Sequence, residues 1–230
     1  MPAKITILSA GAVKPGLAKV IDAFRSETDH EVTISFATAP AIRKQLGGGE
    51  AFDLVIAPPD LLDELASCGK AEIGDRVTVG RIGVGVMVRD GAPVPKIATV
   101  DEFKQSLLNA ESIVYNQAST GIYLESLFDR LGISAQLKAK TTRYPDFAAV
   151  RDHVSNGKGS EIGLGATTVI IESANKGLKF VGPLPAEIQN YTTYAATIMA
   201  DSAAGNAALS LLRYLTSAKA KAMFTTAGIE

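Results

Sequence analysis

The chain has 230 residues, of which 47% are hydrophobic and 20% charged, a composition typical of a globular protein and too apolar for a disordered one. Its 23 Lys and Arg residues against 24 Asp and Glu residues give a net charge of −1, which argues against a broad basic surface for nucleic acid. With one cysteine, two histidines and no apolar run near the ~20 residues that span a bilayer, we expect no internal disulfide, no bound metal, no cofactor and no membrane insertion.

The start of the chain leaves its cellular location open. Met1 leads directly into a strand-like run, without the basic and apolar regions of a leader peptide. The protein is cytoplasmic if Met1 is its native start, and periplasmic if a leader was removed before it.

The first third of the chain repeats one pattern of strand, small-residue turn and helix. Apolar or alternating runs predict the strands, at 5–8, 32–36 and 53–57. Amphipathic runs predict the helices, which include 17–24, 42–46 and 61–66. Pro15 suits the first turn of the first helix, because its missing N–H is not needed there. The repeated pattern predicts βαβ units and a parallel sheet.

The same alternation continues between two long β-rich runs, Val77–Arg89 and Tyr191–Ala200. Periodicity between these runs predicts helices at 101–108, 124–131 and 146–154, and strands at 112–115, 139–143 and 162–165. Thr99 is the expected cap of the first of these helices. After the second run, the pattern predicts two closing helices, one at 209–215 and one through 223–224.

We interpret the two long runs as crossings between two lobes. Residues 1–83 and 193–230 then form the first lobe, and residues 84–192 form a second lobe inserted into it. Two lobes joined by two strands make a hinge, and the crevice between them is the expected ligand site.

The turns after the predicted strands favour an anion as the ligand. In an open α/β sheet, ligands bind beyond the carboxyl ends of the strands. The turns there carry small side chains and hydroxyls, and each precedes a predicted helix whose first N–H groups lack partners and carry partial positive charge. For any single turn, ordinary helix capping, for example by Ser119, is the alternative interpretation. The ligand-binding residues predicted in these turns are Ser9, Gly11, Ala12, Thr38, Ala39, Ala57, Asn116, Ser119, Thr120, Gly121 and Gly165.

Two larger side chains complete the predicted site. Arg143 can clamp a carboxylate through two contacts, and its alternative is an ordinary surface arginine. Tyr191 stands at the second crossing, where its hydroxyl can reach a ligand or its ring can pack the hinge. Lys14 and Arg43 are interpreted as solvated helix residues, and His153 as a surface or boundary residue.

Several catalytic and nucleotide-binding motifs are absent from the sequence. Gly83-Val84-Gly85 and Gly163-Leu164-Gly165 lack the third glycine of a dinucleotide-binding loop. The chain also has no Walker loop and no G-x-S-x-G nucleophile elbow. Nucleotide binding and serine-type hydrolysis therefore have little support.

The chain resembles the molybdate-binding protein family, over nearly its whole length. The resemblance rests on the opening strand and turn and on five further segments: Ser35-Phe36-Ala37 with Gln45-Leu46, Asp53 to Ala57, Gly121-Ile122-Tyr123, Tyr214 to Ser217, and Met223 to Ile229. It implies the two-lobed type II periplasmic-binding fold, an α/β fold with mixed sheets flanked by helices and a ligand cleft between the lobes. It also implies a small-anion-binding protein whose transport partner is the membrane component of an ABC transporter.

Departures from the family's pattern bear on the ligand. Ala12 stands where the family has a serine, Thr38 and Ala39 stand in a turn that is serine-rich in the family, and Pro58 has no N–H to donate. Since a buried tetrahedral oxyanion needs many donors, a di- or tricarboxylate held with the help of an arginine is an equal expectation.

Aconitate isomerases also resemble this family, so a cofactor-free isomerase of a polycarboxylate is the alternative function. Such an enzyme would move an allylic proton with one group as acid and base, and the candidates are Tyr144, Tyr191, His153 and Lys14. A ligand domain of a transcription regulator also fits the fold, but no helix-turn-helix segment precedes Lys4.

Overall fold

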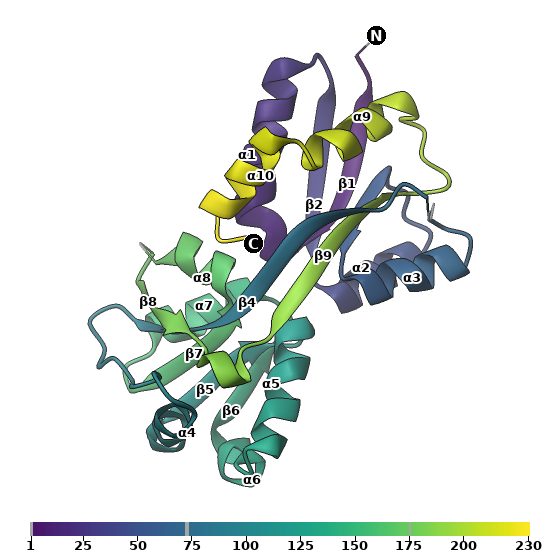
Figure 1. Ribbon diagram of the computed structural model, residues 1–230. Coiled ribbons are helices and arrows are strands. Elements are labelled where there is room, and N and C mark those ends of the chain that lie inside the picture. The colour runs from purple at the N-terminus through teal and green to yellow at the C-terminus, as the bar shows by residue number, and fades with distance from the viewer. Residues whose placement is uncertain (1, 72–73, 175) are drawn as a thin grey trace. The chain divides into compact units, whose positions relative to one another are not determined.

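The computed structural model describes residues 2–71, 74–174 and 176–230 and divides into two compact units (Figure 1). Unit 1 comprises Met1–Ile82 and Thr193–Glu230, and unit 2 comprises Gly83–Thr192. The chain passes from unit 1 into unit 2 along β4 (Val77–Arg89) and returns along β9 (Tyr191–Ile198). The two long β-rich runs of the sequence are these two strands.

Unit 1 is built on three parallel strands, which are β1 (Lys4–Ala10), β2 (Glu31–Ala37) and β3 (Leu54–Ala57). Their order is β2-β1-β3, and β9 continues the sheet antiparallel to β3, followed by β4. This confirms the parallel sheet that the repeated strand–turn–helix pattern predicts, and it adds an antiparallel strand from the far end of the chain.

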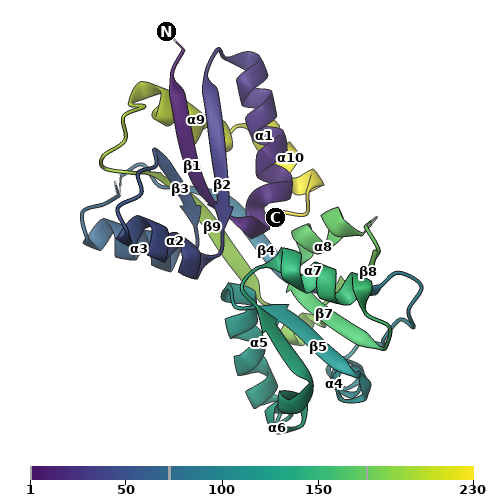
Figure 2. The ribbon, with the colours of Figure 1, turned by 180° about the vertical axis from the view of Figure 1, so that it is seen from behind.

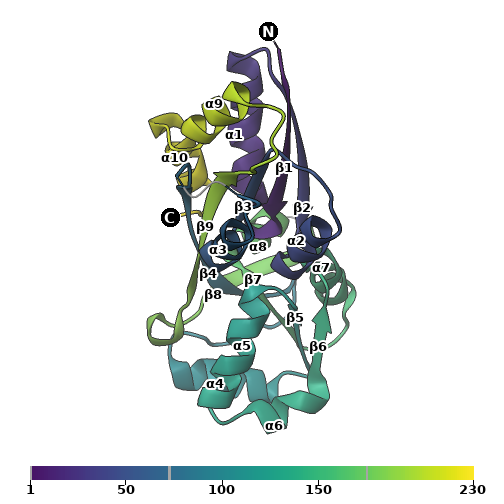
Figure 3. The ribbon, with the colours of Figure 1, turned by 90° about the vertical axis from the view of Figure 1, so that its right-hand side faces the viewer.

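Five α-helices belong to the described part of unit 1, and a 3-10 turn, η1 (Gly11–Val13), precedes the first. They are α1 (Lys14–Glu27), α2 (Ala39–Gly47), α3 (Pro59–Ser67), α9 (Asn206–Leu215) and α10 (Ala218–Thr226). Helices α1, α9 and α10 lie together (Figures 1 and 3). The apolar face predicted for α1 is their contact surface and the core of the unit: Leu17, Val20, Ile21 and Phe24 are at most 2% exposed.

Unit 2 holds a mixed sheet in the order β4-β7-β5-β6, with β8 (Leu178–Pro183) paired to the same strand β4. Strand β5 (Ser112–Asn116) runs parallel to β6 (Thr141–Tyr144) and to β7 (Glu161–Ala166), whereas β4 runs antiparallel to β7. Its helices and 3-10 turns are α4 (Val100–Asn109), α5 (Ser119–Arg130), α6 (Ser134–Leu137), η2 (Lys138–Lys140), α7 (Phe147–Asn156), α8 (Thr167–Ser173) and η3 (Ala186–Ile188).

Alternation along β5 separates the two apolar clusters of unit 2. Ile113 and Tyr115 belong to one cluster, which includes Leu124 of α5. Val114 belongs to the other cluster, which includes Val150 of α7. Because successive strand side chains point to opposite faces, one short strand supplies both cores, and α5 and α7 cover opposite faces of the sheet (Figure 2).

The predicted elements correspond to strands and helices of the structure with few differences. The strand predicted at 139–143 begins only at Thr141, because η2 occupies the residues before it. The sequence did not predict α6 and β8, and it indicated α8 only as a helix that follows the turn after the strand at 162–165. Helix α8 has the sequence TTVIIES, whose β-branched residues favour a strand, and its packing against β7 and β8 outweighs that local preference.

Local signals at two helix starts are confirmed. The Thr99 hydroxyl caps α4 by accepting a hydrogen bond from the N–H of Glu102, with an Oγ1–N distance of 3.2 Å. Pro15 lies in the first turn of α1, as predicted.

Within residues 2–71, 74–174 and 176–230, no helix is both long enough and apolar enough to cross a membrane; the longest, α1, has 14 residues. In the same residues, no three side chains from His, Cys, Asp and Glu gather in a way that could hold a metal ion.

A buried carboxylate ties the sheet of unit 1 together. Asp53 is 7% exposed, and its Oδ2 accepts hydrogen bonds from the N–H and the hydroxyl of Thr6 on β1, both at 2.8 Å. Its Oδ1 accepts from the Ser202 hydroxyl at 2.8 Å and from the N–H of Ala204 at 3.0 Å, in the segment after β9. Burial opposes ionisation, but the hydrogen bonds from Thr6, Ser202 and Ala204 outweigh it and lower the pKa of Asp53.

We expect Asp53→Asn to lower the free energy of unfolding by about 1–3 kcal/mol at neutral pH, because its amide nitrogen faces donors rather than acceptors. A group whose pKa is lowered by folding stabilises the protein above its unfolded pKa and loses that contribution as pH falls through its folded value. The difference between wild type and variant should therefore shrink as pH falls below the ordinary value of 3.8. Urea unfolding across this pH range measures it.

Asp22→Asn is the control, because the Asp22 side chain is 72% exposed and pairs with Arg25 of the same helix. The control should stay within about 0.5 kcal/mol of wild type. An Asp53→Asn variant that is as stable as the control at neutral pH would contradict the role given to this carboxylate.

Candidate functional site

The carboxyl ends of β1, β2 and β3 coincide in unit 1. Ala10 pairs in register with Ala37, and Ser9 pairs with both Phe36 and Ile56. The turns that follow these strands therefore start side by side at one edge of the sheet. This places the predicted residues Ser9, Gly11, Ala12, Thr38, Ala39 and Ala57 around that edge.

The first two of these turns can donate backbone hydrogen bonds to an anion. Gly11 and Ala12 form η1, which leads into α1, and Thr38 is the N-cap of α2, with Ala39 as its first residue. Neither helix has an acidic residue in its first turn or a side chain that caps it. The partial positive charge of both helix starts is therefore not offset by a capping carboxylate.

The third turn of unit 1 is a poor donor. Ala57 is fully buried and pairs in register with Ala195 of β9. Pro58 and Pro59, which follow it, have no N–H, and Asp60 places a carboxylate in the first turn of α3. The Ser9 hydroxyl is also fully buried and donates to the carbonyl of Ala10 at 3.3 Å.

Unit 2 brings a second set of strand ends together. Asn116 pairs in register with Tyr144, and the N–H of Gln117 donates to the carbonyl of Tyr144 at 2.9 Å. The Asn116 side chain turns the chain into α5 by accepting from the N–H of Ala118 at 3.2 Å. The alternative in which Ser119 caps α5 is wrong, because Ala118 is the N-cap and Ser119 is already the first helical residue.

Glycine at position 121 lets the start of α5 approach β5. A Cβ atom on Gly121 would lie 1.8 Å from the carbonyl oxygen of Asn116, a distance that no side chain tolerates. Thr120, beside it, is 8% exposed. The first turn of α5 also lacks an acidic residue, so the N–H groups of Ser119, Thr120 and Gly121 meet no side-chain carboxylate of that turn.

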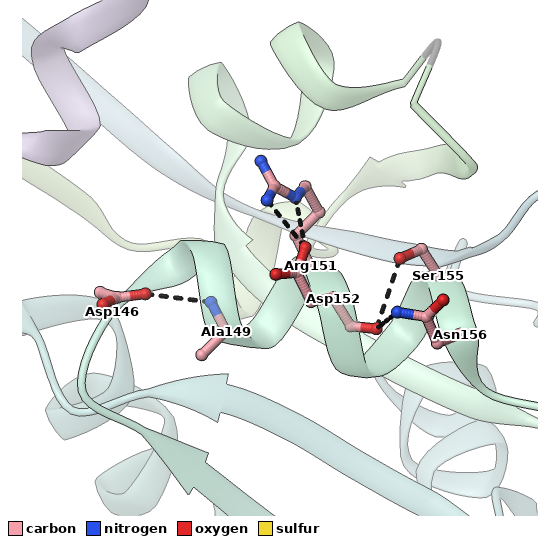
Figure 4. Close-up of polar contacts among 6 residues, drawn as sticks. All are labelled: Asp146, Ala149, Arg151, Asp152, Ser155 and Asn156. Carbon is pink, nitrogen blue, oxygen red and sulfur yellow. Dashed lines mark hydrogen bonds and ion pairs between the residues drawn. The ribbon is translucent and has the colours of Figure 1, made fainter.

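The other helix starts of unit 2 are arranged differently. At the start of α7, the Asp146 carboxylate already accepts from the N–H of Ala149 at 3.0 Å (Figure 4). Gly165 lies within β7, opposite Gly85, and a Cβ there would be 3.0 Å from the ring of Phe147. Gly165 thus makes room for an aromatic ring.

The structure shows which groups lie next to the two larger predicted side chains, Arg143 and Tyr191. Arg143 on β6 forms an ion pair with Glu125 of α5, and its guanidinium carbon lies 5.9 Å from the centre of the Tyr115 ring. Tyr191 is 41% exposed at the start of β9, and a Cβ on Gly83 would lie 3.3 Å from its ring. Glu125 was not identified from the sequence, although Glu125 and Asp129 stand four residues apart on one predicted helix, a spacing that places them on one face.

The other candidate catalytic or charged residues from the sequence also contact neighbouring side chains. The Tyr144 hydroxyl and Nδ1 of His153 lie 3.0 Å apart. Lys14 places its ammonium 5.8 Å from the centre of the Phe36 ring, and Arg43 forms an ion pair with Glu64 at 2.8 Å.

Comparisons with known proteins agree over the whole chain. The family model described as bacterial extracellular solute-binding protein matches residues 5–230. The chain is 31% identical to a protein named aconitate isomerase from a Pseudomonas species, over 98% of this chain and 87% of that protein. It is 25% identical to the molybdate-binding protein ModA of Escherichia coli K12, over 85% of this chain and 77% of ModA.

A solved structure shows the same fold. The periplasmic molybdate-binding protein of Azotobacter vinelandii superposes with a TM-score of 0.82 at 19% identity, and the match covers 98% of each chain. The type II periplasmic-binding fold expected from the sequence is therefore confirmed.

We expect Gly121→Ala to lower the free energy of unfolding by about 1–3 kcal/mol or more, because α5 must move away from the end of β5 to admit the methyl group. Chemical denaturation measures the loss. Gly47→Ala, at the end of α2 where a Cβ would meet nothing within 4 Å, is the matched control and should leave stability nearly unchanged. Equal stability of the two variants would show that the close approach has no energetic weight.

Proposed function

Because the chain belongs to the bacterial extracellular solute-binding protein family, we propose that it binds a small anion through backbone N–H groups and hydroxyls at the carboxyl ends of its strands. The observation that carries this proposal is the pair of turns after β1 and β2. They start in register at Ala10 and Ala37, and each leads into a helix start without a carboxylate. Such helix starts bind anions without a charged side chain.

The hydrogen-bond donors in these turns favour a ligand with two or three carboxylate groups over a tetrahedral oxyanion. Ala12 has no hydroxyl, and Pro58 and Pro59 have no N–H, so the turns of unit 1 offer few donors to concentrate on one small ion. A di- or tricarboxylate spreads its charge over more atoms and needs fewer donors at each. The relative named aconitate isomerase also has a higher identity to this chain than ModA has.

In this proposal, Gly11, Ala12, Thr38 and Ala39 are the ligand-binding residues of unit 1, and Ser119, Thr120 and Gly121 are those of unit 2. Ser9, Ala57, Asn116 and Gly165 act by shaping the turns and the packing around them. Contacts of Arg143 and Tyr191 with this anion stay predictions. A transport role adds the membrane component of an ABC transporter as partner, as a proposal that rests on family membership.

A thermal-shift screen tests the function directly, because a ligand that binds only the folded state raises the melting temperature. The ligands are molybdate, tungstate, sulfate, phosphate, citrate and aconitate. We expect one clear stabiliser, from among the carboxylates. If every anion leaves the melting temperature unchanged, the proposed function is wrong; stabilisation by molybdate alone would overturn only the preference for carboxylates.

Substitutions then test the residues. Thr38→Val keeps the shape of the side chain and removes its hydroxyl, and Ser119→Ala removes the hydroxyl at the start of α5. A hydrogen bond to a charged ligand is worth about 1.5–3 kcal/mol, so each variant should bind the stabilising anion at least about tenfold more weakly by calorimetry. Ser67→Ala is the control, because the Ser67 hydroxyl donates to the Glu64 carbonyl at the end of α3.

The two variants are informative together. Weaker binding in both supports contributions of both units to one ligand, which the sequence predicts. Loss in Thr38→Val alone would restrict the site to unit 1. Unchanged affinity in both, relative to Ser67→Ala, would contradict the assignment of the turns.

Isomerisation of a polycarboxylate is the second candidate function. The 31% identity to a protein named aconitate isomerase, over almost the whole chain, favours it. Such a reaction needs a group that removes a proton next to a carboxylate and returns it elsewhere in the allylic system. Of the four candidate groups Tyr144, Tyr191, His153 and Lys14, Tyr144 and His153 share a hydrogen bond of 3.0 Å, through which a proton can pass between them.

If the protein is an isomerase, NMR spectra of aconitate in heavy water should show deuterium uptake and appearance of the other geometric isomer. His153→Gln should then reduce the rate by at least about a hundredfold if this pair carries the proton. Binding of aconitate without exchange would leave the binding function standing and remove the isomerase. Exchange at an unchanged rate in the variant would move the catalytic role away from His153.

A further inference from the structure

Unit 2 contains a pocket of about 610 Å³ that the proposed anion-binding turns do not use. It is lined by residues of β5, the edge strand β6, η2, α5 and α6, and α5 and α6 stand beside β6 in Figure 1. A volume of this size is typical of sites for small molecules. Its charged lining residues are Glu125, Asp129, Lys138 and Arg143, and its uncharged polar ones are Tyr115, Ser134 and Thr141.

Tyr115 supplies a hydroxyl donor in the wall of this pocket. The residue is only 2% exposed, and its ring lies between the ring of Phe128, whose centre is 6.0 Å away, and the guanidinium of Arg143. Within the described residues, the Tyr115 hydroxyl makes no hydrogen bond, and it is not among the fully buried polar atoms that lack a partner, so this oxygen is accessible at the pocket. Burial, and then the Glu125 carboxylate, raise the pKa of Tyr115 to about 12, so the hydroxyl keeps its proton at neutral pH.

The charges of the pocket are divided between two walls. Glu125 and Asp129 project from one face of α5, four residues apart, a spacing at which like charges repel. Lys138 and Arg143 come from η2 and β6. Arg143 pairs with Glu125, and Asp129 accepts from the Ser134 hydroxyl. The Lys138 side chain forms no ion pair with any described residue.

We propose that this pocket is a second ligand site, which binds a small zwitterion: an amino acid or short peptide with a free ammonium and a free carboxylate. The ammonium faces the carboxylates of Glu125 and Asp129. The carboxylate faces Lys138 and Arg143 and accepts a hydrogen bond from the Tyr115 hydroxyl.

A single charge fits the pocket less well than a zwitterion. A simple anion would meet the two carboxylates of α5, and a simple cation would meet Lys138 and Arg143. A ligand with both charges places an opposite charge at each wall, and its ammonium lies between the two carboxylates of α5 and offsets their repulsion. The inference rests on residues of unit 2 alone, and it shares with the proposed anion-binding function only Arg143, whose contact with the anion is a separate prediction.

Amide NMR spectra of nitrogen-labelled protein test the site. The probes are L-alanine, L-glutamate, L-arginine, L-leucine and glycylglycine, with N-acetyl-L-alanine and L-alaninamide as forms that lack one charge. We expect at least one zwitterion to shift the signals of Tyr115, Lys138 and Arg143 in a saturable way. Each blocked form should bind at least about tenfold more weakly than L-alanine, because one wall then lacks its partner.

Variants of the pocket sharpen the test. Tyr115→Phe should keep the melting temperature, because the hydroxyl makes no hydrogen bond to any residue that the structure describes, and should weaken binding of the zwitterion. Lys138→Met should weaken binding about tenfold, whereas Lys158→Met, at another exposed lysine of unit 2, should not change it. The proposal is overturned if no zwitterion shifts these signals, if the blocked forms bind equally well, or if Lys138→Met binds as well as Lys158→Met.

Discussion

Parallel strands that end in register bring the starts of the following helices together, and the proposed anion site depends on this constraint. In unit 1, the pairing of Ala10 with Ala37 sets η1 and α2 beside each other. In unit 2, the pairing of Asn116 with Tyr144 does the same for α5 and α7. The partial positive charge of a helix start is local, so helices that begin at the same edge can act together on one ligand.

Single residues then decide which helix starts can donate. Pro58 and Pro59 remove N–H groups from the start of α3, and Asp60 adds a negative charge there. Asp146 occupies the start of α7 with its own carboxylate. What is left in each unit is a helix start with small residues and no acid: η1 with α2 in unit 1, and α5 in unit 2. The proposed anion-binding turns are thus set both by residues that remove or occupy N–H groups at some helix starts and by the small residues at the others.

The two proposed sites use different physics. The anion site relies on backbone dipoles at strand ends and has no obligatory charged side chain. The pocket beside β6 relies on formal charges, because Arg143 faces α5 and forms an ion pair with Glu125. The sequence predicts that Arg143 recognises a carboxylate, and the proposed zwitterion site gives it the same role in a pocket that the sequence did not predict.

The sequence by itself determined the order of strands and helices and several of their ends, because periodicity, prolines and caps act within a few residues. The apolar stripe of α1, the cap Thr99 and the long runs that became β4 and β9 are examples. Tertiary structure alone decided that Asp53 joins Thr6 to Ser202 and that Arg143 meets Glu125. These outcomes depend on groups that are distant in the chain, and their energies exist only once packing has brought those groups together.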